Sequence, residues 1–491
     1  MELLLTLERS GADGRPPLPL HVQLEEQLRD AIRREQLLPG TRLPATRELA
    51  RQLAISRGVV VEAYAQLTAE GYLRTRRGAG TVVAEIARPA PPPPPPAMPR
   101  TAPEDFHPGM PDLAAFPRAA WIRSLRTVAR EVPDAAYGYV DPVGAPELRQ
   151  TLARYLGRAR GVGARPERIV VTTGLTQGIA LVARALRARG ATRVVVEDPG
   201  FAVHRLVLSH CGLEPVAVAV DEHGLRTDRL AQVSADAALV TPCHQSPLGG
   251  VLGPDRRAAL LDWARREEAI VIEDDYDAEY RYDRGPVGAL QGLAPERVAY
   301  AGCASKMLAP GLRIGWLALP SALLDAVRSE KALDDLGSPV LDQLALADFV
   351  ERGELDRHLR RMRPRYRARR DALVDALAEH LPSWRIGGVA AGLHTVALLP
   401  EEVDERSLLA RAARRDMRLH GLSWFRVAPG PPGIVLGYGG LSEPAIARLV
   451  PQLAAIYAEE LRGEPAAGRA ASGRAAATAA AAATTGAERA R

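Results

Sequence analysis

The chain has 491 residues, of which 47% are hydrophobic and 25% are charged, and its formal net charge is +5. This length predicts two or three domains, and the composition is typical of a globular protein in water. No apolar run reaches the roughly 18 residues of a membrane helix. The N-terminus lacks the pattern of a signal peptide, and the three cysteines form no metal-type spacing. We therefore expect a cytoplasmic protein with no membrane partner and no metal site.

The first residues with regular structure follow a helical pattern. Apolar residues at helical spacing predict a helix over 20–37, a short second helix over 43–53, and a third helix from Ser56 to about Glu70. Ser56 can cap the third helix, and we expect its inward face to be Val60, Ala63, Tyr64 and Leu67. Residues 72–83 then alternate like a small hairpin. The order of elements predicts a winged helix-turn-helix.

Charge supports a nucleic-acid partner for this module only weakly. Between Arg42 and Ala84 seven arginines outnumber three acids, which a solvated protein face would also explain. The N-terminus of the third helix, with Arg57 and Gly58, is where recognition helices meet base edges and phosphates. A three-helix packing module with exposed arginines is the alternative.

The segment LPATRELARQLAISRGVVVEAYAQLTAEGYLRTRRGAGT, residues 43–81, closely resembles the DNA-binding domain of the GntR family. Ala45 and Val59 replace a serine and a threonine that are usual there. The resemblance implies a double-stranded DNA operator as partner. It assigns the contacts to the second and third helices and the wing, namely to Arg47, Ser56, Arg57, Gly58, Val59, Arg76 and Gly80.

Composition divides the rest of the chain. We expect the DNA-binding domain to end at residue 85 and a Pro-rich linker to span 86–104, where six prolines follow one another. Residues 105–462 alternate β-branched runs with helical patterns, which predicts an α/β domain with a mainly parallel sheet. The expected strands lie at 168–171, 193–196, 238–240 and 269–272, and expected helices at 177–189 and 255–268. The Ala-rich residues 463–491 have little to bury, which predicts a disordered tail.

The strongest chemical pattern surrounds Lys306, one of two lysines in the chain, in ASKMLAPGLRIGW at residues 304–316. A lysine that binds a cofactor aldehyde needs its amine beside that group. The forked guanidinium of Arg313 suits a phosphate. SKxLAPGLRIG resembles the Schiff-base segment of type I fold aminotransferases, and specifically that of the MocR group of GntR regulators.

The resemblance implies pyridoxal 5'-phosphate as cofactor, with Lys306 as the Schiff-base lysine and Ser305 and Arg313 among the cofactor-binding residues. It also implies a homodimer and the type I fold of pyridoxal-phosphate-dependent transferases. In that fold we expect a large part at about 135–330 and a smaller C-terminal α+β subdomain at about 331–462.

The segment IVIEDDY, residues 270–276, ends a buried strand in carboxylates. An acid must face the pyridine nitrogen to keep it protonated. By the same resemblance Asp274 is that acid and Tyr276 bonds the ring hydroxyl. Glu273 and Asp275 remain alternatives, because only the register of the strand separates the three. A metal site is disfavoured because no histidine cluster accompanies these carboxylates.

Further cofactor contacts follow from shorter matches to the same group of proteins. A glycine turn between a strand and a helix can bind phosphate through backbone N–H groups. Phe201 can stack on the cofactor ring, with a core phenylalanine as the alternative. Tyr139 fits a tyrosine that reaches the phosphate of the partner subunit, with a core tyrosine as the alternative. The remaining expected contacts come from TTGLTQG and TPCHQSPLG, namely Gly174, Leu175, Thr176, Gln177, His244 and Gln245.

One position departs from the aminotransferase pattern. Many aminotransferases hold the substrate carboxylate with a late arginine, but Val435 stands there in this chain. Arg426 is a possible substitute. Losing such a contact costs about 1.5–3 kcal/mol, so we expect at most residual aminotransferase activity.

We expect a MocR-type transcriptional regulator in which the cofactor, or an amine or amino-acid effector that forms an aldimine, modulates operator binding. The alternatives are an active aminotransferase whose DNA-binding module only tethers it, and a regulator that has lost the cofactor.

Overall fold

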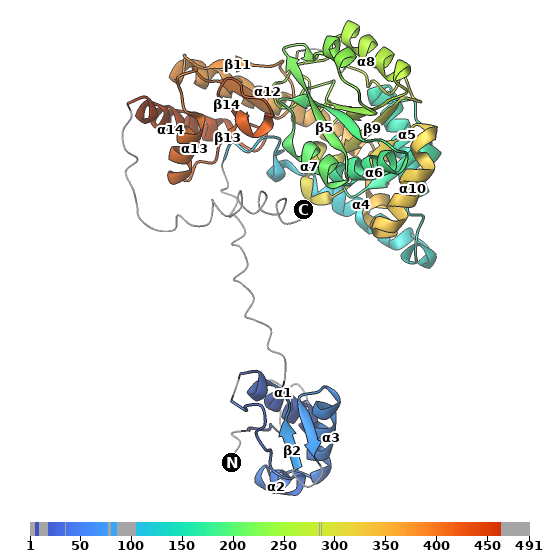
Figure 1. The fold of residues 1–491 in the computed structure, drawn as a ribbon, viewed down its shortest axis with the longest axis vertical. Coiled ribbons are helices and arrows are strands. Elements are labelled where there is room, and N and C mark those ends of the chain that lie inside the picture. Colours follow the sequence, from blue (N-terminus) through green and yellow to red (C-terminus); the bar gives the residue numbers. More distant parts are fainter. Residues whose placement is uncertain are drawn as a thin grey trace. The chain divides into compact units, whose positions relative to one another are not determined.

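The computed structural model describes residues 5–8, 18–34, 36–76, 80–85, 105–283, 285 and 287–462. It divides into two compact units, Met1–Arg100 and Thr101–Arg491 (Figure 1). The expected linker at 86–104 and tail at 463–491 lie outside the described residues.

The first unit is a winged helix-turn-helix. Its elements are α1 (Leu20–Arg33), α2 (Thr46–Gln52), α3 (Arg57–Ala69) and the antiparallel pair β1 (Leu73–Arg76) and β2 (Gly80–Val83). The Ser56 side chain accepts a hydrogen bond from the backbone N–H of Val59, at 3.4 Å, and so caps α3 as expected. The predicted inward face of α3 is confirmed, since Val60, Ala63, Tyr64 and Leu67 are all buried.

Helix α1 is shorter than the sequence pattern predicts. It ends at Arg33, and the backbone N–H groups of Gln36 and Leu37 both turn back to the carbonyl of Ala31. Leu37 is still buried in the core of the unit. Its apolar character therefore reflects packing after the helix rather than a further turn of it.

The second unit is built on a large, mainly parallel sheet, which confirms the prediction. Its strand order is β3-β10-β9-β8-β7-β4-β5-β6, in which β10 is antiparallel to both neighbours and β6 is antiparallel to β5. The strands are β3 (Ile169–Thr172), β4 (Arg193–Asp198), β5 (Glu214–Asp221), β6 (Gly224–Leu225), β7 (Ala237–Val240), β8 (Ile270–Asp274), β9 (Val298–Cys303) and β10 (Gly315–Ala318).

Helices cover both faces of this sheet. Alternate residues of a strand point to opposite faces, and on β4 Val194 and Val196 join one apolar cluster while Val195 joins another. The first cluster includes α6 (Leu175–Ala188), α7 (Ala202–His210) and α10 (Ser321–Asp335), and the second includes α8 (Pro254–Arg266). The helices α4 (Arg118–Glu131), α5 (Pro146–Arg160) and α11 (Val340–Glu351) pack in the largest cluster.

A smaller subdomain follows the long helix α12 (Glu354–His380), as Figure 1 shows. Its sheet has the antiparallel order β11-β12-β14-β13 and packs with two further helices. The elements are β11 (Arg385–Gly387), β12 (His394–Leu398), α13 (Glu405–Arg414), β13 (His420–Gly421), β14 (Gly433–Gly437) and α14 (Glu443–Leu461). The predicted α+β character of this part is therefore confirmed.

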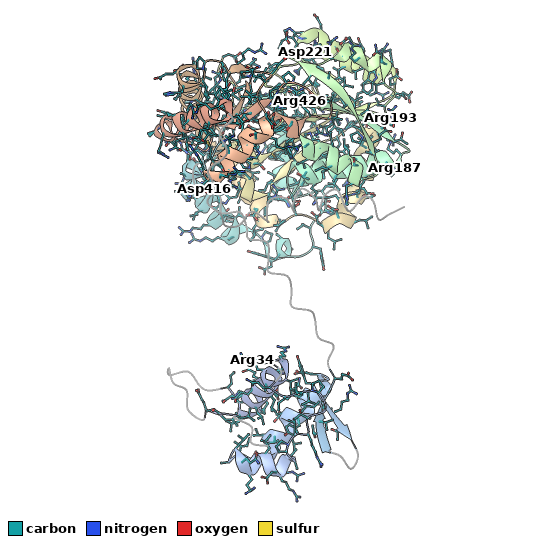
Figure 2. All side chains as sticks on the ribbon, turned by 60° about the vertical axis from the view of Figure 1, so that its left-hand side comes forward. Arg34, Arg187, Arg193, Asp221, Asp416 and Arg426 are labelled. Carbon is teal, nitrogen blue, oxygen red and sulfur yellow. The ribbon has the colours of Figure 1, made fainter. Side chains whose placement is uncertain are left out.

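Arginine supplies the positive charge at the surface, as Arg34, Arg187 and Arg193 illustrate in Figure 2. Lys331 on α10 is instead fully buried, and its ammonium donates to Asp335 at 2.6 Å and to the hydroxyl of Ser338 at 3.0 Å. Within the described part of the chain, no helix has both the length and the apolar character needed to cross a bilayer.

Candidate functional site

A cavity of about 590 Å³ lies where the parallel strands of the large sheet end. Ligands of open α/β sheets bind outside these carboxyl ends. Strand β8 ends in Asp274, and β9 leads directly into the short helix α9 (Ala304–Met307), which carries Ser305 and Lys306. The smaller subdomain closes the opposite side with residues of β12, β13 and β14. Segments that are far apart in sequence therefore form one cavity.

The amine of Lys306 lies against the backbone of Gly109. A Cβ atom at this glycine would lie 2.9 Å from the Lys306 Nζ atom, and the φ of +69° also favours glycine. This segment carries no cofactor-binding motif, although Pro108-Gly109 is a turn signal. A side chain at position 109 would displace the Lys306 amine.

Asp274 is the carboxylate that lines the cavity. Its side chain is buried, the His204 Nε2 atom lies 3.1 Å from Oδ2, and Oδ1 has no hydrogen-bond partner among the described residues. Burial raises the pKa of the Asp274 carboxyl, and the imidazole of His204 opposes this rise. A cationic N–H group placed against Oδ1 would satisfy it and stabilise its charge.

The neighbouring carboxylates have partners elsewhere. Glu273 accepts hydrogen bonds from the backbone N–H groups of Leu290, at 2.8 Å, and Gln291, at 3.0 Å. Asp275 pairs with the buried guanidinium of Arg160 at 2.7 Å. Neither residue lines the cavity. The register left open by the sequence therefore places Asp274 alone of the three on the cavity wall.

Tyr276 contacts a histidine that is itself bound to a carboxylate. The Nδ1 atom of His244 lies 3.0 Å from the Tyr276 hydroxyl and 3.0 Å from Asp277 Oδ2. Because a carboxylate only accepts, Nδ1–H donates to Asp277, which leaves the Tyr276 hydroxyl hydrogen available to another acceptor. Burial and the charges of Asp277 and Asp274 hold the pKa of Tyr276 well above its ordinary value. His244 therefore contacts the cavity residue Tyr276 without lining the cavity itself.

The opposite end of the cavity combines a helix start with a guanidinium. Leu175 and Thr176 begin α6 and line the cavity together with Arg313. Gly174 has a φ of +106°, and a Cβ atom there would lie 2.5 Å from the Arg313 Nη2 atom. Free N–H groups at a helix start and a forked guanidinium both suit a phosphate.

Gln177 lies behind this phosphate-compatible end. Its Oε1 atom accepts from the backbone N–H of Thr173 at 2.8 Å, and its Nε2 atom donates to Asp334 at 2.7 Å and to Asp335 at 2.9 Å. Asp335 in turn binds the buried ammonium of Lys331. Gln177 therefore connects the start of α6 to α10 and does not line the cavity.

The remaining expected contacts have different surroundings. Phe201 lines the cavity and contacts Trp424 edge to face, with ring centroids 5.8 Å apart. Gln245 is buried, and its amide donates to the carbonyl of Pro199 at 2.9 Å. Tyr139 is 94% exposed and does not line the cavity. The sequence pattern alone did not distinguish these three environments.

The far wall contains residues that no motif indicated. His394, His420 and Trp424 line it beside Val435, which is fully buried. The guanidinium of Arg426 does not line the cavity and instead donates to the carbonyl of Pro431 at 3.4 Å. Among the described residues, none gathers into a metal-binding cluster of histidine, cysteine, aspartate and glutamate.

The residues expected to contact DNA all belong to the first unit, the winged helix-turn-helix. Arg47 on α2 and Arg57 on α3 are exposed, and the Arg57 Nε atom lies 3.4 Å from the Thr46 hydroxyl. Ser56, Gly58 and Val59 form the start of α3. Gly80 begins β2 with a φ of +81°, and the side chain of Arg76 lies outside the described residues.

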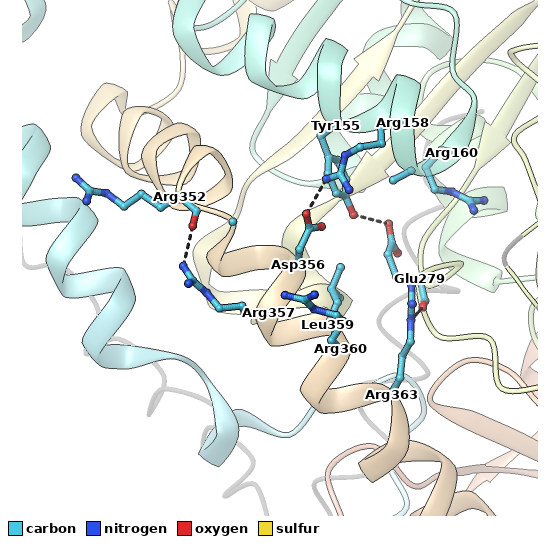
Figure 3. A pocket seen from close by; sticks show the side chains of 12 residues that line it. Tyr155, Arg158, Arg160, Glu279, Arg352, Asp356, Arg357, Leu359, Arg360 and Arg363 are labelled. Atoms are coloured by element: carbon cyan, nitrogen blue, oxygen red, sulfur yellow. Dashed lines mark hydrogen bonds and ion pairs between the residues drawn. The ribbon is translucent and has the colours of Figure 1, made fainter.

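A second cavity, of about 470 Å³, is lined by arginines of α5 and α12 (Figure 3). We call it the arginine cleft. Arg158 pairs with Asp356 at 2.8 Å, and Arg363 donates to the carbonyl of Glu279 at 2.8 Å. Its lining residues are Tyr155, Arg158, Ala159, Arg160, Glu279, Arg352, Gly353, Asp356, Arg357, Leu359, Arg360 and Arg363.

Residues 20–83 match the gntR family of bacterial regulatory proteins, and residues 118–430 match the aminotransferase class I and II family. The HTH-type pyridoxine biosynthesis transcriptional regulator PdxR of Corynebacterium glutamicum is 35% identical over 438 residues, covering 88% of this chain and 94% of that protein. The probable rhizopine catabolism regulatory protein MocR of Rhizobium meliloti is 35% identical over 462 residues, covering 89% and 92% respectively. The chain belongs to the MocR-type regulators of the GntR family.

The second unit of this MocR-type regulator is similar to solved aminotransferases. The kynurenine aminotransferase of Pyrococcus horikoshii matches with a TM-score of 0.68 and 26% identity, covering 74% of this chain and 92% of that one. An archaeal alanine:glyoxylate aminotransferase matches with a TM-score of 0.68 and 28% identity, covering 73% and 91%. The chain is therefore a DNA-binding transcriptional regulator with an aminotransferase-like unit.

Proposed function

We propose that this regulator binds pyridoxal 5'-phosphate in the Lys306 cavity and that occupancy of the cavity changes its affinity for operator DNA. When bound, pyridoxal phosphate supplies an aldehyde that reacts with primary amines. The observation that carries the proposal is the position of Asp274. Its carboxylate lines the same cavity as the Lys306 amine and has a buried Oδ1 atom without a hydrogen-bond partner among the described residues.

The cavity residues fit the parts of this cofactor. Lys306 would hold the aldehyde carbon, and Asp274 would keep a proton on the pyridine nitrogen. The Tyr276 hydroxyl would donate to the ring hydroxyl, and Phe201 would cover one ring face. The helix start at Leu175 and Thr176, with Gly174, Ser305 and Arg313, would bind the phosphate.

The other expected residues would act through these contacts or across a subunit boundary. His244 would orient Tyr276, while Gln177 and Gln245 would fix the segments around them. The exposed Tyr139 would contact the phosphate of a second subunit in a homodimer. Tyr137, two residues earlier, is also exposed, and exposed large side chains of this kind support such an interface.

The domain boundaries belong to the same proposal. A DNA-binding domain at 1–85 would be joined to an aminotransferase-like domain at 105–462 by a Pro-rich linker at 86–104, with a disordered tail at 463–491. An amine or amino-acid effector that reaches Lys306 would favour one arrangement of the two DNA-binding domains over another. Such a protein would act in the cytoplasm, beside the DNA.

Loading of the full-length protein with pyridoxal phosphate tests the cofactor site. We expect a visible absorbance band that is retained after dialysis in the wild-type protein and lost in Lys306→Ala. DNA binding is measured in parallel by fluorescence anisotropy, with a duplex selected from a random-sequence pool. No retained band, or the same DNA affinity with and without cofactor and amines, would contradict the proposal.

The DNA-binding module is tested with a pair of arginine variants. Arg57→Ala should weaken binding to the selected duplex by about 1–3 kcal/mol if Arg57 contacts a base. Arg51→Ala is the control, because Arg51 is exposed on α2 and pairs with Glu48 at 2.7 Å. Equal losses in both variants would assign only a general charge effect to Arg57.

An active aminotransferase with a tethering DNA-binding module is the other function considered. Val435 is buried on the cavity wall where the sequence comparison expects the carboxylate-binding arginine. We therefore propose that the protein is not an efficient transaminase. Steady turnover of an amino acid and a 2-oxo acid, with DNA binding indifferent to both, would reverse this assignment.

A further inference from the structure

The wall of the Lys306 cavity that belongs to the smaller subdomain is formed by three adjacent strands. In the sheet register Val435 of β14 lies opposite His420 of β13 and Val396 of β12, and His394 of β12 lies opposite Gly437. Val435, His394 and His420 all line the cavity. We call this set of three residues, together with Trp424, the subdomain wall.

The subdomain wall carries no guanidinium. Among the described residues that line the cavity, Arg313 is the only arginine, and its guanidinium lies against Gly174 at the start of α6. Val435 is fully buried and apolar. A ligand carboxylate placed at Val435 would lose its hydration without gaining a charged partner there.

Neighbouring arginines are bound to backbone carbonyls outside the cavity. The Arg205 Nη1 atom donates to the carbonyls of Gly200 and Phe425, both at 3.0 Å. Arg426, which Figure 2 labels, donates to Pro431. Neither residue lines the cavity. Their guanidinium groups therefore do not form part of the cavity wall, and the buried Nε atom of Arg426 has no hydrogen-bond partner among the described residues.

The histidines of the subdomain wall are poor substitutes for an arginine. Burial, together with the nearby His244 and Lys306, lowers the pKa of His394 to about 3, so its ring is neutral near pH 7. Its Nε2 atom lies 3.3 Å from the carbonyl of Pro247 and must carry the ring N–H. The Nδ1 atom is then a buried lone pair without a hydrogen-bond partner in the described structure. Burial also lowers the pKa of His420.

The same wall offers aromatic surface. Trp424 contacts Phe201 with ring centroids 5.8 Å apart and Phe425 with centroids 4.8 Å apart, and all three line the cavity. About half of Trp424 is exposed. A flat, apolar group of a ligand can pack edge to face or stacked on these rings.

We propose that the effector of this regulator is an arylalkylamine, a primary amine that carries an aromatic group and no carboxylate on the carbon next to nitrogen. The inference rests on the proposed function, because it assumes that the effector amine reaches Lys306. The neutral wall at Val435 and His394 disfavours an α-carboxylate. The half-exposed ring of Trp424 favours an aromatic side chain.

Matched pairs of compounds test this proposal on the full-length, cofactor-loaded protein. Tyramine and tyrosine, or phenethylamine and phenylalanine, share a side chain and differ by one carboxylate. Affinity is measured by calorimetry and by the shift of the visible absorbance band. We expect each amine to bind at least about tenfold more tightly than its amino acid, since a buried carboxylate without a charged partner is disfavoured by more than 1.4 kcal/mol.

The outcomes separate this inference from the proposed function. A protein that retains no cofactor contradicts the proposed function before any amine is added. A loaded protein that binds the amino acids as tightly as the amines, or binds neither compound of a pair, contradicts the inference alone. Tighter binding of the amino acids would mean that a cation from outside the described wall, such as one of a second subunit, holds the carboxylate.

A substitution in the subdomain wall provides a second test of the proposal. Val435→Arg should reverse the preference within each pair, and Val435→Leu, the matched apolar change, should keep it. Circular dichroism and cofactor retention show whether each variant folds. If Val435→Arg folds and still prefers the amines, position 435 does not determine the selectivity. If it does not fold, the comparison of matched compounds on the wild-type protein decides.

Discussion

The Lys306 cavity and the arginine cleft have similar volumes, about 590 and 470 Å³, but differ in how their polar groups are satisfied. In the cleft, opposite charges meet within the chain, as Arg158 and Asp356 do at 2.8 Å. Arg160 has one buried nitrogen without a partner, yet its charge is already paired with Asp275. In the Lys306 cavity, Asp274 and His394 each have a buried acceptor that no described residue satisfies.

This difference teaches that charge and volume alone do not define a ligand site. A buried acceptor without a partner costs about 1–3 kcal/mol, and a bound ligand that donates to it would remove this cost. In the arginine cleft the ion pair of Arg158 and Asp356 joins α5 to α12. The following predictions test whether the two cavities differ in this way.

The largest effect is expected from removing a carboxylate charge in the Lys306 cavity. Asp274→Asn should lower the affinity for pyridoxal phosphate by about 10- to 100-fold, the value of a charged hydrogen bond of about 1.5–3 kcal/mol. Asp356→Asn is the matched control in the arginine cleft and should leave cofactor affinity unchanged. Fluorescence titration measures both. Equal losses would show that the two carboxylates are not distinguished by their surroundings.

Two glycines with the same backbone angle give a smaller and more specific contrast. Gly109 and Gly353 both have a φ of +69°, but only a Cβ atom at Gly109 would approach Lys306, whereas nothing lies within 4 Å at Gly353. Alanine at either position should cost about 1–2 kcal/mol of folding free energy, because a left-handed conformation strains a side chain. Only Gly109→Ala should also weaken cofactor binding, by about tenfold. Urea unfolding and fluorescence titration measure the two losses, and weaker cofactor binding by Gly353→Ala would contradict the expectation.

The smallest expected effect is a pH dependence that originates in the arginine cleft. Burial, with the charge of Asp275, raises the pKa of Glu279 to about 7. The folded state therefore keeps this proton at pH values where the unfolded chain releases it, and stability falls as pH rises from about 4.5 to 7. Glu279→Gln should reduce that fall without changing cofactor affinity.

Tryptophan fluorescence during urea unfolding at pH 5 and pH 7 measures this difference. All five tryptophans lie in residues 121–424, so the signal reports the second unit alone. A variant whose stability changes with pH as much as that of the wild type would locate the titrating group elsewhere.

The features that the sequence predicted correctly are formed by residues close together in the chain. The spacing from Lys306 to Arg313, the carboxylates at the end of β8 and the inward face of α3 are each a pattern within one short segment of the chain. Each could be recognised because secondary structure fixes the relation between residues close in sequence. The mainly parallel sheet followed from the same local patterns, repeated along the chain.

The residues that were missed depend on long-range packing. Gly109 and His394 lie far from Lys306 in sequence and carry no motif. They reach the cavity because the backbone N–H of Gly437 binds the carbonyl of Phe106 and because His394 lies opposite Gly437 in the sheet. Adjacent residues are equally hard to separate, since His244 supports Tyr276 whereas Gln245 turns to Pro199.

The scarcity of lysine has a practical consequence for peptide mapping. Lys331 is fully buried and paired with Asp335. In the folded protein, Lys306 is therefore the lysine amine that a reagent can reach. After denaturation, a protease that cuts only after lysine divides the chain into residues 1–306, 307–331 and 332–491. Any stable covalent change at the Lys306 amine blocks the first cut and leaves residues 1–331 intact. One digest, read by mass, therefore reports the chemical state of Lys306.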